Sequence, residues 1–170
     1  MPKIAVKNYK EVEVKLANNA PSAMNAELQL NDGILEKVLE ANDIEVPQDL
    51  VDEEVRMMIL EMNHRMKYES LATGAHVDFT QEDMNARLEE FKAEAFKLVK
   101  TRLVLKGIIE VERLEVTKDE LEEEAKAISV RQQMPVDMVK NFLGEDLELL
   151  KDDLLIRKAI DHVHANAVIK

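Results

Sequence analysis

The chain of 170 residues has no cysteine and no tryptophan, and only four glycines and four prolines. Without cysteine, disulfides, thiolate zinc sites and cysteine nucleophiles are all excluded. Aromatic residues make up only 4% of the chain, which weakens any case for a surface that stacks nucleobases. The longest apolar run, Met57–Leu60, is far too short to cross a membrane, and residues 1–25 lack the apolar stretch of a secretory signal. We therefore expect a soluble, cytoplasmic protein that does not bind membranes.

The charge balance is strongly acidic. There are 35 Asp and Glu residues against 23 Lys and Arg residues, a formal net charge of −12. Such a chain repels phosphate backbones, so binding to nucleic acid by counterion release is disfavoured. The acidic surface is expected to keep the protein soluble, and the alternative is that it favours basic binding partners. A salt titration separates the two, because only the second predicts marked weakening of binding with salt.

The N-terminal residues differ from the rest of the chain. Apolar side chains alternate with polar ones around Tyr9, which is typical of one strand or two short ones. The alternating residues are Ile4, Val6, Val12, Val14 and Leu16. Residues 18–22 read as a linker. Because no other strand is predicted to pair with this one, we expect either a hairpin around residues 7–10 or pairing with a second copy in a homodimer.

The remaining chain is predicted to be helical, because few glycines and prolines accompany many Glu, Lys, Leu, Ala and Met residues. Pro47 and Pro135 suit opening helical positions, Gly74 and Gly144 suit helix ends, and Thr117 with Glu120 forms a capping box. The expected helices cover residues 25–42 (with a potential break at 31–33), 47–73, 81–112, a fourth from 117, 135–144 and 145–169.

Two of these helices carry a clear apolar stripe with a spacing of three or four residues. In the second helix the stripe is Val51, Val55, Met58, Met62 and Met66. In the third helix it is Met84, Leu88, Phe91, Ala95, Leu98, Arg102, Leu105 and Ile109, with a shoulder of Lys92, Phe96, Val99 and Leu103. The stripe and shoulder together are wider than one partner helix requires.

A faint internal repeat suggests how these helices are organised. Val46, Asp49, Glu53 and Glu54 recur 70 positions later, and Leu98, Leu103, Lys106 and Ile108 have counterparts 52 positions later. Each repeat is a helix, a reversal and a returning helix, which predicts two hairpin arms at about residues 46–112 and 116–169. The expected fold is thus mainly α and elongated, with a short N-terminal β segment. Chance similarity among Glu-rich helices is the alternative explanation.

An ordered set of short motifs resembles the C-terminal domain of the trigger factor family over roughly residues 25–170. The motifs are Glu27-Leu28, residues 34–38, Val46-Pro47, residues 100–105, 144–146 and 158–161. Residues 6–14 are similar to the family's segment entering the prolyl isomerase domain, so residues 1–20 look like a remnant of that connection. The resemblance implies a helical chaperone domain at residues 21–170 whose two arms hold unfolded or nascent chains without ATP. We expect neither isomerase activity nor ribosome docking from this chain alone, because its residues do not resemble the domains that carry those activities in the family.

A chaperone of this kind needs exposed apolar surface rather than a catalytic group, and methionine adapts to many shapes. Four of the nine methionines fall within a single stretch of ten residues, 57–66, in the first predicted arm. The client-binding residues that we expect are Met57, Ile59, Met62, Met66, Phe96, Leu103, Met134, Met138 and Phe142. Met57, Phe96, Leu103 and Phe142 are favoured because they lie off the main stripes, whereas Met58 and Met62 suit a core.

Two other classes of protein fit parts of the sequence. One is a helical adaptor that binds a single defined partner. The other is a dimetal carboxylate bundle, since Glu61-x-x-His64 and Asp161-x-x-His164 approximate its paired motifs. With Met58 and Met62 facing a core, His64 points toward solvent, and we expect the histidines of both motifs on the surface. No phosphate loop or nucleophile motif is present, so we expect no enzyme activity, no cofactor, no metal and no ATP.

Overall fold

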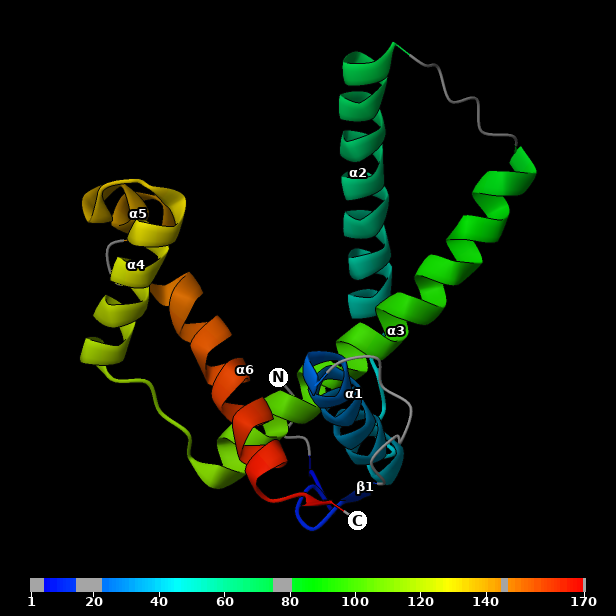
Figure 1. Ribbon diagram of the computed structural model, residues 1–170. Coiled ribbons are helices and arrows are strands. Elements are labelled where there is room, and N and C mark those ends of the chain that lie inside the picture. The colour runs from blue at the N-terminus through cyan, green and yellow to red at the C-terminus, as the bar shows by residue number, and fades with distance from the viewer. Residues whose placement is uncertain (1–4, 15–22, 75–80, 145–146, 170) are drawn as a thin grey trace. The chain divides into compact units, whose positions relative to one another are not determined.

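The computed structural model describes residues 5–14, 23–74, 81–144 and 147–169, and it is mainly α as expected (Figure 1). The linker predicted at residues 18–22 lies outside these ranges. In chain order the elements are β1 (Glu13–Val14), α1 (Ala23–Ala41), α2 (Gln48–Thr73), α3 (Gln81–Glu112), α4 (Lys118–Gln132), α5 (Val136–Leu143), α6 (Glu148–Ala165) and β2 (Val168–Ile169).

The chain divides into two compact units. The first unit comprises residues 1–43 and 104–170, and the second comprises residues 44–103. The helix α3 runs through both, because its residues 81–103 belong to the second unit and residues 104–112 to the first.

Local sequence explains most helix ends. The residue before α2 is Pro47, and after it Gly74 adopts a left-handed conformation (φ 68°) and donates its backbone N–H to the Ser70 carbonyl. The short α5 lies between Pro135 and Gly144, as predicted. The potential break at residues 31–33 does not occur, and α1 continues through it. There a Cβ on Gly33 would lie 3.3 Å from Cγ1 of Val14, so the missing side chain lets β1 pack close to the helix.

The N-terminal strand pairs with the opposite end of the chain. The strands β1 and β2 run parallel, with Glu13 opposite Val168 and Val14 opposite Ile169. The expectation that β1 has no partner within its own chain, and so forms a hairpin or pairs with a second copy, was therefore wrong. The prediction missed β2 because residues 166–169 were assigned to the last helix. That helix instead ends at Ala165, where the side chain of Asn166 donates to the His162 carbonyl at 2.8 Å.

The core of the first unit also buries part of the N-terminal segment. Buried apolar side chains come from α1, from the end of α3 and from α6, and they are Ile34, Val38, Leu39, Val104, Leu105, Ile108, Ala159 and Val163. Tyr9 is buried too, and its hydroxyl donates to Oε1 of Glu112 at 2.5 Å. The buried Asn42 accepts the backbone N–H of Lys7 through its side chain at 2.6 Å. The residues before β1 are thus packed as part of this unit.

The carboxylate of Glu112 makes two polar contacts with the N-terminal segment. It pairs with Nζ of Lys10 at 2.7 Å and accepts a hydrogen bond from the Tyr9 hydroxyl, and these two contacts lower the pKa of its carboxyl. Burial, reinforced by the hydrogen bond to Glu112, raises the pKa of Tyr9 to about 12. The Tyr9 hydroxyl therefore stays protonated and continues to donate to Glu112 well above neutral pH.

The helices α4, α5 and α6 enclose a second, smaller core in the first unit. Its buried members are Leu121, Ala125, Val139, Leu147, Leu150 and Leu154. Partly buried Val116, Ile128, Met134 and Leu143 pack against them. Leu121 and Ala125 on α4 and Leu150 and Leu154 on α6 recur at helical spacing and line this core, while α5 packs against both helices.

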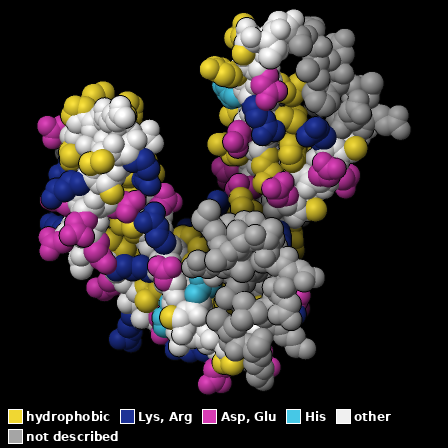
Figure 2. Space-filling model, in the orientation of Figure 1, with side chains coloured by type: hydrophobic (Ala, Val, Ile, Leu, Met, Phe, Trp, Pro, Cys, Tyr) yellow, Lys and Arg dark blue, Asp and Glu magenta, His cyan; other side chains and the backbone are white. Residues whose placement is uncertain are grey.

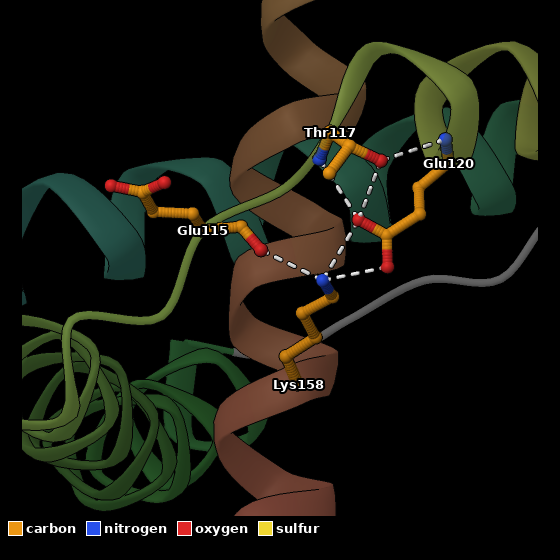
Figure 3. Close-up of polar contacts among 4 residues, drawn as sticks. All are labelled: Glu115, Thr117, Glu120 and Lys158. Atoms are coloured by element: carbon orange, nitrogen blue, oxygen red, sulfur yellow. Dashed lines mark hydrogen bonds and ion pairs between the residues drawn. The ribbon is translucent and has the colours of Figure 1, made fainter.

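A lysine on α6 joins the start of α4 to the preceding segment (Figure 3). Nζ of Lys158 donates to the Glu115 carbonyl at 2.7 Å and pairs with Oε1 of Glu120 at 2.7 Å. Glu120 also accepts the backbone N–H of Thr117 at 2.8 Å, while the Thr117 hydroxyl accepts the N–H of Glu120. This is the predicted capping box, and Lys158 extends it across to another helix. The bonds from Lys158 and Thr117 lower the pKa of Glu120 to about 2.

The depressed pKa of Glu120 predicts a pH dependence of stability. An ionised Glu120 stabilises the fold at neutral pH, and this contribution is lost as the pH falls from about 4.5, the unfolded value, through about 2. We expect the Glu120→Gln variant to have a lower Tm than wild type at pH 7 and to approach wild type near pH 2, measured by calorimetry across this range. Glu123→Gln, which alters an exposed acid of the same helix, is the control. If Glu123→Gln lowered the Tm at pH 7 as much as Glu120→Gln does, the stabilising role assigned to the ionised Glu120 would be contradicted.

Candidate functional site

The second unit leaves apolar side chains uncovered beyond its core. In α2 the buried residues are Val51, Val55 and Met62, and none of the residues from 63 to 74 is buried. In α3 the first buried residue after Asn85 is Ala95, followed by Val99 and Leu103. Burial therefore ends partway along both helices, and Leu71 near the end of α2 is 87% exposed.

The exposed apolar side chains of this unit alternate with charges. They are Met57, Leu60, Tyr68 and Leu71 on α2, and Phe96 and Leu98 on α3. Figure 2 shows hydrophobic side chains on α2 and α3 lying between Lys, Arg, Asp and Glu side chains. An ion pair between Arg102 and Glu54, at 3.3 Å, joins the two helices. The unit thus presents separate apolar contacts within a charged surface.

A second group of exposed apolar side chains surrounds α5 in the first unit. It consists of Val130 near the end of α4, Met138 and Phe142 on α5, and Leu149 at the start of α6. Phe142 is 70% exposed, although the neighbouring Val139 is buried in the small core. Figure 2 shows hydrophobic side chains gathered over the α5 end of these helices. A short helix therefore turns one face to the core and the other to solvent.

The structure divides the nine expected client-binding residues into three groups. Met57, Phe96, Met138 and Phe142 are exposed. Ile59, Met66 and Met134 are half-buried, and Met134 packs against the small core. Met62 and Leu103 are buried, so the expectation that they offer surface to a client is corrected.

The error at Leu103 has a simple geometric cause. The sequence placed Leu98 and Arg102 on the core stripe of α3 and Val99 and Leu103 on its shoulder, whereas the structure buries Val99 and Leu103 and exposes Leu98 and Arg102. Ala95 and Leu105 of the predicted stripe are buried, so the buried face departs from the stripe only between them, where it shifts by one residue, or about 100° around the helix. The guanidinium of Arg102 reaches Glu54 at the surface, and it replaces the apolar contact that the stripe assumed.

Several exposed apolar residues were not anticipated. Leu60, Tyr68, Leu71, Val130 and Leu149 are exposed, and none of them belongs to a predicted stripe. Tyr68 and Leu71 follow Met66 on α2, beyond the last position that the α2 stripe contains. The predicted stripe stops at Met66, although the helix continues to Thr73. That difference is the sequence feature that could have identified Tyr68 and Leu71 as exposed.

No metal site is found among the residues that the structure describes. Within them, no group of three His, Cys, Asp or Glu side chains lies close enough to hold an ion. His64 is exposed, as expected, but His162 and His164 are half-buried rather than on the surface. Their Nε2 atoms are buried without a hydrogen-bond partner, and Nε2 of His162 lies 3.6 Å from Oε2 of Glu112. Across the described ranges, no helix has the length and apolar content to span a membrane.

Comparison with known proteins gives a consistent result. Residues 9–165 match the family model described as the bacterial trigger factor protein C-terminus. Trigger factors from Bacillus thuringiensis and Bacillus cereus are 32% identical over 165 residues, covering 96% of this chain and 39% of their own length. The chain therefore spans about two fifths of these relatives.

A solved structure supports the same fold. It comes from work on the structures of, and interactions between, domains of trigger factor from Thermotoga maritima. The TM-score is 0.65 at 20% identity, with 95% of this chain and 93% of that chain covered. Since the family model matches most of the residues, the chain belongs to the trigger factor family of chaperones and corresponds to its C-terminal part.

Proposed function

We propose that this chain is an ATP-independent chaperone domain that binds unfolded or nascent polypeptides in the cytoplasm and limits their aggregation. One observation carries the proposal. Apolar side chains stay exposed in both units, although the helices that bear them are held by separate buried cores. These side chains are available to contact apolar segments of a client, and they are spread over the two predicted arms, at about residues 46–112 and 116–169.

Dispersed contacts suit transient binding. Burying one large apolar side chain contributes about 1.5–3 kcal/mol, and part of that gain is lost in ordering a flexible client. A client that covers two or three of these side chains is held weakly enough to leave and fold. Methionine at positions 57 and 138 adapts to different client side chains, since its chain is unbranched and polarisable. Binding of this kind requires neither ATP nor a catalytic residue.

Replacing Met57, Phe96 and Phe142 together by serine is expected to weaken aggregation suppression about tenfold or more. Each substitution removes an exposed apolar contact on a different helix, α2, α3 or α5, without opening a core. The measurement is the chaperone concentration that halves light scattering by a diluted, chemically denatured client. Helicity by circular dichroism is expected to remain that of wild type.

A matched variant controls for the number and location of substitutions. Lys67→Ser, Glu94→Ser and Asn141→Ser alter exposed polar residues on the same three helices. This control is expected to suppress aggregation like wild type. Equal suppression by both triple variants would contradict the assignment of Met57, Phe96 and Phe142 to client contact.

The number of clients separates a chaperone from an adaptor. A chaperone delays the aggregation of several unrelated unfolded proteins, because apolar contacts are common to all of them. An adaptor recognises one folded partner and leaves such clients unaffected. We expect delayed aggregation for at least three clients of unrelated sequence, and no effect on any of them would overturn the proposal.

A further inference from the structure

Methionine supplies all the side-chain sulfur of this protein. The chain has nine methionines and no cysteine. Peroxides oxidise side-chain sulfur, and in a chain without thiols the methionine thioether is the group they attack. The product, methionine sulfoxide, is polar and chiral, whereas the original side chain is flexible and apolar. Oxidation of a methionine therefore changes the character of the surface on which it lies.

The methionines differ widely in their access to solvent. The structure describes the side chains of six of the nine. Met57 on α2 is 58% exposed and Met138 on α5 is 46% exposed, whereas Met62 is 5% exposed. The half-buried ones are Met58, Met66 and Met134. Because a peroxide must reach the sulfur atom, Met57 and Met138 are expected to be oxidised first among these six.

Met57 lies on the side of α2 that faces away from the buried side chains of this helix. At about 100° per residue, it is roughly 140° around the helix from the buried Met62. The exposed Leu60, Tyr68 and Leu71 all lie within about 60° of Met57. Oxidation of Met57 therefore adds a polar oxygen to an exposed apolar stripe and leaves the buried face of α2 intact.

Met138 has the corresponding place on α5. The exposed Phe142 follows it by four residues, so the two side chains lie one turn apart on the same face. The buried Val139 points about 100° away around the helix and belongs to the small core. Met57 and Met138 thus lie among the apolar side chains assigned to client contact, one in each predicted arm, and neither is a buried core residue.

We propose that Met57 and Met138 form a reversible oxidation site through which a peroxide lowers the affinity of this chain for its clients. The proposal rests on the chaperone function proposed above and adds its regulation. The thioether sulfur gives two electrons to the peroxide, so an S–O bond forms, the O–O bond breaks and the second peroxide oxygen leaves as water. A methionine sulfoxide reductase reverses the change, because two electrons and two protons from a dithiol break the S–O bond and release its oxygen as water.

The sulfoxide weakens binding because its oxygen is a hydrogen-bond acceptor. When a client covers the side chain, this oxygen loses its water, and an apolar client side chain offers no donor in return. Each predicted arm loses one apolar contact in this way. Since a client is held by few such contacts, oxidation of both methionines is expected to lower affinity about tenfold.

The order of oxidation is the first measurement. After limited treatment with hydrogen peroxide, peptide mass spectrometry is expected to show that Met57 and Met138 gain an oxygen about tenfold faster than Met62. Equal rates at these three residues would overturn the proposal. The circular dichroism of the treated protein is expected to match that of the untreated protein. Loss of helicity would attribute weaker binding to unfolding and would also overturn the proposal.

Client affinity before and after treatment is the second measurement. Fluorescence anisotropy with reduced, carboxymethylated α-lactalbumin, a permanently unfolded client, reports the affinity. Catalase removes the peroxide before the client is added, so only the chaperone is oxidised. Wild type is expected to bind about tenfold more weakly after treatment and to recover its affinity with a methionine sulfoxide reductase and dithiothreitol. Affinity that does not recover would overturn the proposal.

Two double variants assign the effect to individual methionines, each compared with its own untreated form. Met57→Leu with Met138→Leu keeps apolar side chains of similar volume but removes both exposed sulfur atoms, so treatment is expected to leave its affinity unchanged. The matched control, Met62→Leu with Met134→Leu, removes a buried and a half-buried sulfur atom, one from each arm. This control is expected to lose affinity as wild type does. Loss in the first variant, or protection in the second, would overturn the assignment.

Failure of the oxidation site and failure of the chaperone function give different results. If untreated and oxidised wild type bound the client equally well, the oxidation site would be overturned and the proposed function would stand. If untreated wild type did not bind the client, the proposed function would fail first and its regulation with it.

Discussion

Replacing Tyr9 by alanine is expected to lower the free energy of unfolding of the first unit by about 3–5 kcal/mol, the cost typical of removing a buried aromatic side chain. The ring is buried, its hydroxyl donates to Glu112, and it lies 6.4 Å from the ring of His162 on α6. Its loss leaves a cavity where the N-terminal segment meets the ends of α3 and α6. Urea unfolding followed by circular dichroism measures the change.

The Tyr9→Phe variant separates packing from hydrogen bonding. It keeps the ring and removes the bond to the Glu112 carboxylate, so a smaller loss of about 1.5 kcal/mol is expected. The raised pKa of Tyr9 adds an alkaline signature. Its contribution to stability is present below the unfolded value of 10, and it is lost as the pH rises through about 12. Wild type should lose stability over that range more steeply than Tyr9→Phe, and identical alkaline profiles would contradict the contact.

Replacing Ile108 by alanine is the second substitution with a large expected effect, a loss of about 2–5 kcal/mol. Ile108 is fully buried on α3. Together with Ile34 and Leu105, it is among the largest fully buried side chains of the described residues. Removing it opens a cavity in the core that α1, α3 and α6 share. Thermal unfolding of the purified chain measures the change.

Val111→Ala is the control for this effect. It lies three residues further along the same helix but is exposed, so its cost is expected to stay within about 0.5 kcal/mol. Comparable losses for Ile108→Ala and Val111→Ala would show that helix propensity, rather than core packing, determines the response of α3.

Local chemistry made the helices predictable from sequence. The capping box at Thr117, the prolines at positions 47 and 135 and the glycine at position 74 act within one helical turn, so they specify helix ends without knowledge of the fold. The α2 stripe was predictable for the same reason, since Val51, Val55 and Met62 repeat at helical spacing and are buried.

Features that depend on distant partners were not predictable. The pairing of β1 with β2 joins the two ends of the chain, and two residues of strand leave almost no periodic pattern. On α3, a shift of one residue decided whether Leu98 or Val99 faced the core, and that shift depends on the partner helix. The candidate site shows the same limit. Met57, Phe96, Met138 and Phe142 were expected at the surface and are exposed, whereas the burial of Met62 and Leu103 depends on how the helices pack.

The parallel pairing of β1 and β2 has a mechanical consequence. The chain enters β1 from its N-terminal side and leaves β2 toward its C-terminus, while both strands point the same way. Tension between the two ends therefore slides the strands past each other instead of peeling them apart. The bonds from Glu11 to Asn166 and from Val168 to Val12 then bear the load at the same time. A contact of only two residues per strand thus resists pulling at the termini as a shear joint.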